Sequence, residues 1–269
     1  MIAGLDDYSD EELLREVLER PREAHVPYAD LHEIVRPGWQ QCITPSFFRG
    51  GLNSVDLAVL DHLDDAVIDA VIDATIAEYD ALAIRFRWNI GPDSRPHDLA
   101  ARLEARGLTP RRVLLLAAAI ADLEVEAPPD ATIAVEPVDE HNLAAHAAVV
   151  AAGWDVAPEP LIAYERAVIA HRIRHLAALN QSFLATIDGA PVGAANAICF
   201  PRSLYLMGAV VLPAHRGRGV YRALIAARLD LARTRGVALA TCQALADTSA
   251  PILTRMGFVT IAEQQSFSR

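Results

Sequence analysis

The sequence is poor in cysteine and has no long apolar run. Its three cysteines, Cys42, Cys199 and Cys242, are odd in number and far apart, so they suit a reducing compartment better than a disulfide framework. The apolar stretch 113–121 is much shorter than the ~18 residues that a membrane-spanning helix needs. The charged segment 1–20 has no apolar stretch suited to secretion. We therefore expect a cytoplasmic protein with no membrane partner.

Basic residues are also scarce, since 24 Lys and Arg stand against 35 Asp and Glu and the net charge is −11. The resulting long-range field repels nucleic acid, so no nucleic-acid partner is expected. An anionic ligand would need a local basic patch. Apolar residues make up 52% of the chain, which is enough for a packed core. A length of 269 residues favours two domains over one.

Apolar spacing in the first half predicts alternating helices and strands. One helical face runs through residues 64–79, and residues 82–90 are β-like. Asp93 or Ser94 is placed to cap a helix over 96–106, which Gly107 ends. The residues 113–120 then predict a buried strand.

Residues 124–130, with two adjacent prolines, form the best candidate linker. They divide the chain into domains at 1–126 and 132–269. In the second domain the pair Asp188-Gly189 predicts a β-hairpin, and 204–212 predicts a single strand ended by Pro213. The other expected elements are strands at 132–135, 183–187, 191–198, 237–243 and 258–267, and helices at 140–152, 160–179 and 249–256.

The two halves share a similar helix end. Residues 103–108 read Leu-Glu-Ala-Arg-Gly-Leu, and residues 253–258 read Leu-Thr-Arg-Met-Gly-Phe, each after a helix, a strand and a second helix. Internal self-similarity of this kind indicates duplication, although the spacings differ by several residues and chance similarity stays open.

The segment that carries chemistry follows Pro213. A strand leads into His215-Arg216-Gly217-Arg218-Gly219-Val220-Tyr221-Arg222, which opens a helix with Val220, Leu224, Ala227 and Leu231 on one face. Helix N-termini present unpaired N–H groups and positive potential, and glycine allows close backbone approach, so a pyrophosphate is the natural ligand. Residues 215–235 hold six arginines and one acid, a local charge of +5.

On these residues the chain resembles the GCN5-related N-acetyltransferase (GNAT) family, whose signature is Arg or Gln, two residues, Gly, one residue, then Gly or Ala. Arg216 and Gly219 match it, and Tyr221 replaces the last small residue. The resemblance covers residues 132–267 and implies an α+β fold with a mixed central sheet flanked by helices. It also implies an enzyme that moves an acetyl group from acetyl-CoA, its co-substrate, directly to an amine.

The resemblance implies two contacts with the cofactor. Backbone N–H groups of the glycine turn would hold the pyrophosphate, and the pantetheine arm would pair like an added strand. The residues implied are Ala209, Val210, Val211, Arg216, Gly217, Arg218, Gly219, Val220, Tyr221 and Arg222.

The general acid of the family does not carry over. Many members have a tyrosine four residues before the glycine of the last Gly-Phe, where this chain has Leu253, and an asparagine earlier in that helix, where it has Ala246. The catalytic residues are therefore unknown. Candidates near an acceptor, each also explained as a structural or solvated side chain, are Tyr205, Tyr221, Asp247, Glu159, Tyr164 and Glu165.

The first half offers no second phosphate site. Its strand-to-helix junction, residues 59–65, has no glycine and three aspartates, which would repel phosphate. If this half is a related fold, it is a degenerate one that completes the acceptor pocket or buries a shared face. One acyl-CoA site per chain is expected.

Other classes of protein fit less well. A dinucleotide-binding turn would need a third glycine where Arg222 stands, and no Gly-Lys-Ser or Gly-Lys-Thr phosphate loop occurs. His171 and His175 have metal-ligand spacing but two flanking arginines, so no metal is expected. A non-catalytic acyl-CoA-binding or regulatory module stays open because Leu253 replaces the tyrosine. The acceptor, a small-molecule or peptide amine, and the oligomeric state are not specified.

Overall fold

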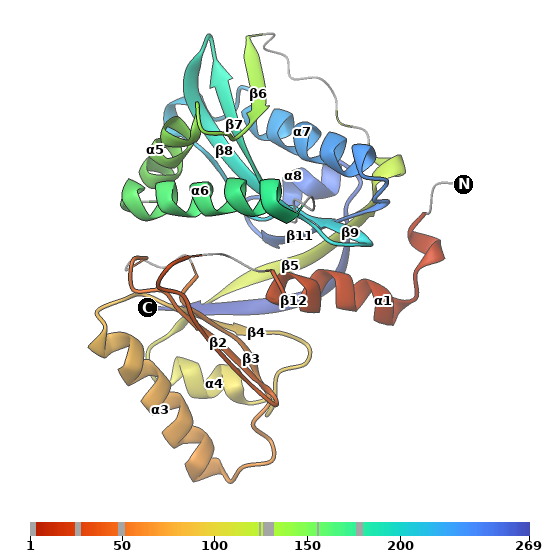
Figure 1. Ribbon diagram of the computed structural model, residues 1–269. Coiled ribbons are helices and arrows are strands. Elements are labelled where there is room, and N and C mark those ends of the chain that lie inside the picture. Colours follow the sequence, from red (N-terminus) through yellow and green to blue (C-terminus); the bar gives the residue numbers. More distant parts are fainter. Residues whose placement is uncertain are drawn as a thin grey trace. The chain divides into compact units, whose positions relative to one another are not determined.

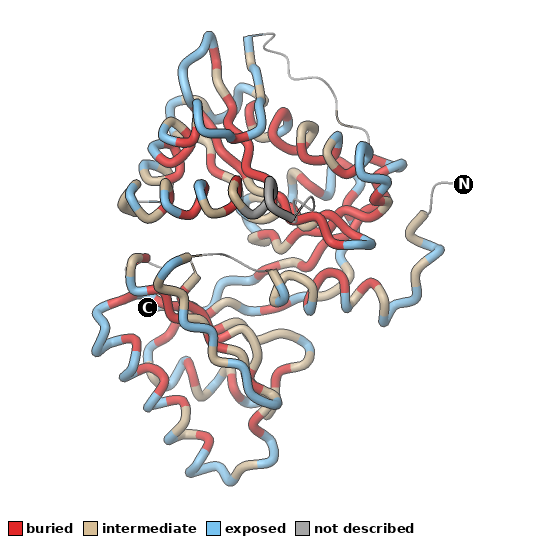
Figure 2. Tube along the Cα trace, viewed as in Figure 1, coloured by how far each residue is buried: buried red, intermediate tan, exposed pale blue. Residues whose placement is uncertain are grey.

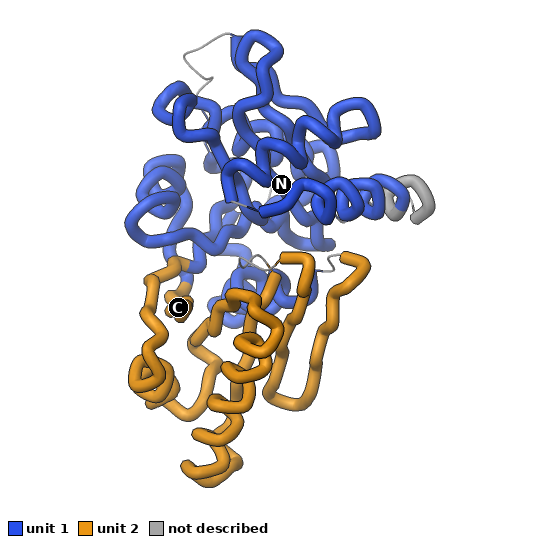
Figure 3. Tube along the Cα trace, turned by 90° about the vertical axis from the view of Figure 1, so that its left-hand side faces the viewer, with its two compact units in different colours: residues 1–27, 115–261 blue, residues 28–114, 262–269 orange. Residues whose placement is uncertain are grey.

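The computed structural model describes residues 4–24, 28–47, 52–123, 125, 132–154, 156–175 and 180–269, without the side chains of 171–175. The chain forms two compact units (Figure 3). Unit 1 contains residues 1–27 and 115–261, and unit 2 contains residues 28–114 and 262–269. Each unit is therefore completed by a segment from the other end of the sequence.

Unit 1 is built on a mixed sheet with the strand order β5-β11-β9-β8-β7-β6, and β10 pairs with β8 outside this order (Figure 1). Its strands are β5 (Thr109–Ala119, in unit 1 from residue 115), β6 (Ile133–Pro137), β7 (Asn180–Ile187), β8 (Ala190–Cys199), β9 (Ser203–Tyr205), β10 (Ala209–Val211) and β11 (Leu239–Leu245). Its helices are η1 (Leu5–Asp7), α1 (Asp10–Leu14), η2 (Arg15–Glu19), α2 (Arg20–Arg22), η3 (Ile120–Asp122), α5 (Leu143–Trp154), α6 (Pro158–His175), η4 (Pro213–His215), α7 (Val220–Thr234) and α8 (Ala250–Arg255).

Helices α5 and α7 cover opposite faces of this sheet. Gly153 in α5 lies against the side chain of Val210 in β10, whereas Gly193 in β8 faces Val220 in α7. Gly193 is the strand partner of Val211, the neighbour of Val210, and successive side chains of a strand point to opposite faces. The strands between these helices are largely buried (Figure 2).

The hairpin expected at Asp188-Gly189 is confirmed. Both residues have positive φ, 50° and 80°, as a two-residue turn between right-twisted strands requires. The single strand expected over 204–212 is wrong, because it is divided into β9 and β10. The N–H of Asn196 in β8 faces two carbonyls, those of Met207 and Gly208, each at 3.1 Å, and this bulge interrupts the strand.

Unit 2 has the strand order β1-β2-β3-β4-β12. Its elements are β1 (His32–Arg36), β2 (Trp39–Ile43), β3 (Ser54–Ala58), α3 (Asp65–Ala81), β4 (Arg87–Ile90), α4 (Leu99–Glu104) and the end of β12 (Val259–Ser268). The predicted helix over 64–79 is confirmed as α3, whose buried face packs into a core around Tyr79 and Trp88. The predicted cap of the next helix is wrong, since α4 begins after Asp98 with no side-chain cap, and Ser94 instead accepts a hydrogen bond from Gly91 N–H.

The two similar helix ends found in the sequence have the same local structure. Helices α4 and α8 are each six residues long. Gly107 and Gly257 follow them with φ of 81° and 105°. The N–H of the next residue bonds back to the helix in both cases, from Leu108 to Leu103 at 3.2 Å and from Phe258 to Leu253 at 3.1 Å. A strand then leaves each glycine, β5 in one half and β12 in the other.

The predicted linker over 124–130 lies outside the described residues, apart from Val125. The compact units assign residues 1–27, 115–126 and 262–269 differently from the sequence-based division into 1–126 and 132–269. Within the described residues, no helix is both long enough and apolar enough to cross a membrane.

Candidate functional site

The strands β10 and β11 diverge. Strand β9 is paired on both sides, with β8 and in parallel with β11, and its last pairing joins Tyr205 to Thr241. A final hydrogen bond runs from Leu206 N–H to the Thr241 carbonyl at 2.8 Å. Beyond it, β10 pairs with β8 alone among the described residues. The sheet therefore has a splayed strand pair, with one backbone edge of β10 left without a strand partner.

The backbone groups on this edge come from Ala209 and Val211. The N–H of Leu212 bonds to the Val192 carbonyl at 2.9 Å, so Leu212 faces β8. In an antiparallel pair the backbone groups of successive residues point alternately toward and away from the partner. Val210 therefore faces β8, whereas its two neighbours face away from it. The edge is closed in part, because Arg216 Nε donates to the Val211 carbonyl at 3.2 Å.

The glycine turn follows directly after this edge, as the sequence predicted. Gly217 and Gly219 have φ of 76° and 93°, in the left-handed region that glycine adopts without strain. Gly219 is the N-cap of α7 and supplies no side chain to it. The first intrahelical bond runs from Ala223 N–H to Gly219 O at 3.0 Å, so the N–H groups of the preceding turn are not used by the helix.

The arginines of residues 215–235 do not form one patch, which corrects the interpretation of their summed charge. Arg216, Arg218 and Arg222 are exposed at the turn. Arg233 pairs with Asp230 at 2.7 Å, and Arg228 is buried with 1% exposure. Three of the six arginines, Arg216, Arg218 and Arg222, therefore lie at the turn.

The buried face of α7 also differs in part from the expected one. Val220 and Leu224 are buried as predicted, whereas Ala227 and Leu231 are only half-buried. Arg228 occupies the buried face in their place. The sequence does contain a signal for the burial of Arg228. Arg228 follows Leu224 by four residues, and this spacing places both side chains on the same face of the helix.

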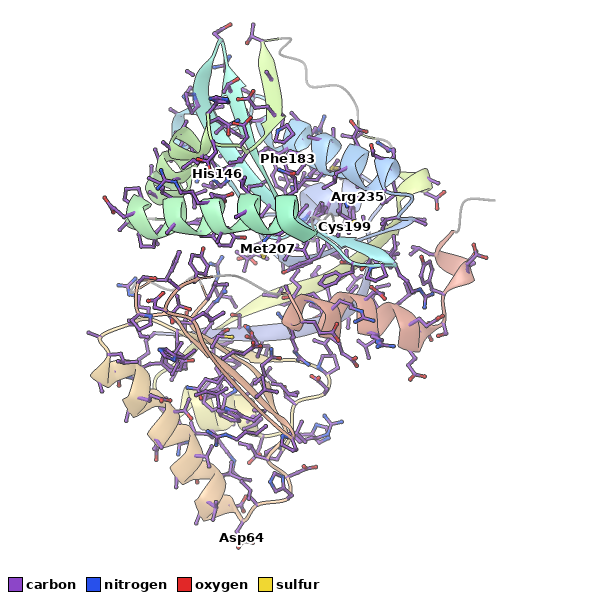
Figure 4. All side chains as sticks on the ribbon, in the orientation of Figure 1. Asp64, His146, Phe183, Cys199, Met207 and Arg235 are labelled. Atoms are coloured by element: carbon purple, nitrogen blue, oxygen red, sulfur yellow. The ribbon has the colours of Figure 1, made fainter. Side chains whose placement is uncertain are left out.

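Two of the predicted acceptor-side candidates belong to the interior of unit 1. The Tyr164 hydroxyl accepts a hydrogen bond from Asn180 Nδ2 at 2.5 Å. Glu165 accepts from Ser182 Oγ at 2.8 Å and lies 3.4 Å from Nδ1 of His146. Burial lowers the pKa of His146 to about 4, so this histidine is neutral at pH 7. His146 is labelled in Figure 4, and sequence reasoning missed it.

The other candidates are dispersed. Glu159 and Asp247 are exposed, and Tyr205 is half-buried in β9. Leu253, at the position of the family's tyrosine, is fully buried in α8. Trp154 ends α5 and is 44% exposed. Its ring lies against Gly208, where an added Cβ would be 2.9 Å away, so an aromatic wall stands beside the bulge.

In unit 2 the corresponding strand edge is occupied by the chain itself. Strands β3 and β4 are parallel and pair at two positions, and the residue after β3, Val59, then pairs with Arg95. Arg95 N–H bonds to the Ala58 carbonyl at 2.9 Å, and Leu60 N–H bonds to the Arg95 carbonyl at 2.9 Å. The helix that follows, α3, begins after Asp64 (Figure 4), with no glycine turn.

A mixed sheet with a splayed parallel pair, leading through a glycine turn into a helix, is the architecture of acyl-CoA-dependent N-acyltransferases. Residues 138–258 match the model of the acetyltransferase (GNAT) family, and this part of the chain is a GNAT domain. The family binds acyl-CoA and transfers the acyl group to an amine. A search of curated protein sequences finds no match to the chain.

Solved structures share the fold over both units. A GCN5-related N-acetyltransferase from Kribbella flavida is 19% identical with a TM-score of 0.62, over 93% of this chain and 95% of that one. A tandem GNAT protein from the clavulanic acid biosynthesis pathway is 14% identical with a TM-score of 0.59, over 99% and 97%. A conserved protein of unknown function from Staphylococcus epidermidis is 12% identical with a TM-score of 0.63, over 93% and 98%. At these identities the likeness concerns the fold alone.

Proposed function

We propose that the chain is an N-acetyltransferase that takes its acetyl group from acetyl-CoA, bound at one site in unit 1. The observation that carries this proposal is the backbone edge of β10, which has no strand partner among the described residues and runs directly into the glycine turn before α7. An extended pantetheine arm has amide groups that can pair with Ala209 and Val211 as an added strand would. The pyrophosphate would then meet the N–H groups of the first turn of α7.

The cofactor-binding residues in this proposal divide by role. Ala209 and Val211 contribute main-chain groups to the pantetheine, and Val210 holds that strand in place through its pairing with β8. Gly217, Gly219, Val220 and Tyr221 contribute backbone at the turn. The exposed cations Arg216, Arg218 and Arg222 balance the phosphate charge.

Direct transfer requires three things of the site. The amine must be deprotonated and aimed at the thioester carbonyl, the carbonyl oxygen needs an N–H donor, and the thiolate must leave. The exposed backbone at the bulge of Gly208 is a source of such a donor near the inner end of the β10 edge. A cationic amine is the acceptor class favoured by the net charge of −11.

We assign the transferase to the half that spans 132–269 and regard the half at 1–126 as a degenerate relative without its own cofactor. The backbone pairing of Arg95 with Ala58 and Leu60 supports this, because it uses the groups that a pantetheine arm would need. The aspartates at 61, 64 and 65 would also repel a pyrophosphate.

A non-catalytic acyl-CoA-binding module is the second candidate, favoured by the buried Leu253 at the position of the family's proton donor. A thiol-release assay with acetyl-CoA separates the two. Polyamines, aminoglycosides and peptide N-termini would be supplied in turn, with the Gly219→Glu variant as the control for the cofactor site. Thiol release that depends on one amine supports the enzyme. Tight acetyl-CoA binding without release for any amine would support the binding module.

A further inference from the structure

The inner end of the β10 edge is marked by Cys242 and Leu206. They are the first residues beyond the last β9–β11 pair, and Cys242 Sγ lies 3.6 Å from the Leu206 carbonyl. An extended arm that enters at the glycine turn and pairs along Val211 and Ala209 would end at this point. The reactive end of a cofactor bound in the proposed way would therefore lie close to the vertex of the splay.

A buried cation lies beneath this vertex. Arg228 has 1% exposure, and its Nε donates to the Leu224 carbonyl at 3.0 Å. Its Nη1 donates at 3.3 Å to the carbonyl of Asn196, the residue whose N–H faces the bulge. Nη2 has no partner of normal hydrogen-bond geometry among the described residues, and no carboxylate there pairs with this guanidinium. Arg228 therefore has no counter-charge among the described residues. A buried charge without compensation costs several kcal/mol.

Tyr221 lies beside this cation. Tyr221 stands seven residues before Arg228 on the same face of α7, and its half-buried phenol interacts with the Arg228 guanidinium. Burial raises the pKa of Tyr221 to about 12, although Arg228 opposes the rise, so the hydroxyl keeps its proton at pH 7. Burial likewise raises the pKa of Cys242 to about 11. These three side chains therefore carry one positive charge, no negative charge and a hydroxyl donor.

We propose that Tyr221 and Arg228 stabilise the coenzyme A thiolate as it leaves, Tyr221 by donating a hydrogen bond to the sulfur and Arg228 by supplying the positive charge. This inference rests on the proposed function. The leaving thiolate would be a counter-charge for Arg228 during each turnover. Tyr221 and Arg228 would also take the place of the family's tyrosine proton donor, at whose position this chain has Leu253.

The proposed step balances without a further reactant. The neutral amine nitrogen attacks the thioester carbon, a C–N bond forms, and the C–S bond breaks with its electron pair going to sulfur. The nitrogen loses a proton to solvent, and the thiolate takes one from solvent when it is released. Tyr221 keeps its own proton, because its phenol is more basic than a thiol with an ordinary pKa of about 8.5.

The test measures the pKa of the bound thiol and needs no acceptor. Thiolate absorbance near ~240 nm is followed against pH for coenzyme A bound to the protein, with the complex of desulfo-coenzyme A as the blank for tyrosine and cysteine. Because one pKa unit is a tenfold stabilisation of the thiolate, we expect the bound thiol to titrate at least about one unit below free coenzyme A.

Two variants and one control assign the effect. Tyr221→Phe and Arg228→Met should each return the thiol toward its free pKa, measured at coenzyme A concentrations that saturate each variant. Methionine is similar to arginine in volume and removes the charge, and apolar residues of similar volume are often tolerated in place of buried charged ones. Tyr164→Phe removes a buried hydroxyl elsewhere in unit 1 and should leave the thiol pKa as in the wild type.

The outcomes are distinct. A bound thiol that titrates like free coenzyme A would overturn the thiolate-stabilising pair while leaving the cofactor site intact. A shift that survives both variants would overturn the assignment to Tyr221 and Arg228. Failure of the wild-type protein to bind coenzyme A would overturn the proposed function, and this inference with it.

Discussion

Gly219 is constrained both by its conformation and by its place at the start of α7. Its φ of 93° costs an L-residue about 1–2 kcal/mol, and the N–H groups that follow it face the proposed pyrophosphate. We expect Gly219→Glu to weaken acetyl-CoA binding more than about 100-fold by steric block and charge. Gly219→Ala carries the same backbone strain without the charge and should weaken it less than about tenfold. Isothermal titration calorimetry measures both, and equal losses would contradict the electrostatic part of this account.

His146 makes the stability of unit 1 depend on pH. Burial lowers its pKa from an ordinary value of 6.5 to about 4, so between these values the unfolded chain binds a proton that the folded chain does not. Stability is therefore lost as the pH falls from 6.5 to about 4, by about 3 kcal/mol for this group at about 1.4 kcal/mol per unit.

Urea unfolding of the wild type and of His146→Met, at pH 7 and at pH 4.5, tests this prediction. The exposed carboxylates are common to both proteins, so only the difference between their pH slopes is assigned to His146. The wild type should lose about 2–3 kcal/mol more than the variant over this range. Parallel slopes would show that His146 is not held neutral by burial.

At this scale, conformation was easier to predict than burial. The glycines of the turn and the pair Asp188-Gly189 could be read from the sequence, because positive φ is a local property of the residue. The burial of Arg228 could not, because an arginine on a helix is normally solvated and its position depends on which face the sheet covers. Tyr221 and Arg228 share one face of α7, seven residues apart, whereas the approach of Cys242 in β11 to them is purely tertiary.

Strand β10 is held at its splayed position by a close approach to α5. A Cβ at Gly153 would overlap Cγ2 of Val210, and α5 is helical there, so the space rather than the conformation requires glycine. We expect Gly153→Ala to destabilise unit 1 by about 1–3 kcal/mol through overpacking, and to weaken acetyl-CoA binding by displacing the edge.

The control for this variant adds the same methyl group elsewhere in unit 1. Gly4 has no neighbour within 4 Å and a φ of −87°, so Gly4→Ala should change neither stability nor binding appreciably. Thermal unfolding and calorimetry would be run on both variants. Wild-type behaviour of Gly153→Ala would show that β10 is not positioned by this contact.

Elements were predicted well where their pattern is local. The hairpin, α3 and the glycine-ended helices α4 and α8 follow from periodicity and turn residues. The division of 204–212 into β9 and β10 was missed, although Gly208 marks it, because an isolated glycine inside an apolar strand is the sequence signal of a bulge. That bulge is fixed by a partner strand, through the N–H of Asn196.

Across the whole molecule, the two units differ in how a strand edge is used. In unit 1 the edge of β10 has no strand partner among the described residues, and in unit 2 the edge of β3 pairs with Arg95. The sequence predicted the second half as the cofactor-binding one from its glycines and charge. It did not predict that Arg95 would fill the other edge, or that each unit takes a strand end from the other half, because both depend on pairing over long sequence separations.

The most direct test of this account is a calorimetric titration of acetyl-CoA into the wild-type chain and into Gly219→Glu, with the number of sites left free in the fit. We predict one site per chain in the wild type and none in the variant. Two sites per chain, or one site that survives in Gly219→Glu, would contradict the assignment of the cofactor to the β10 edge and its glycine turn.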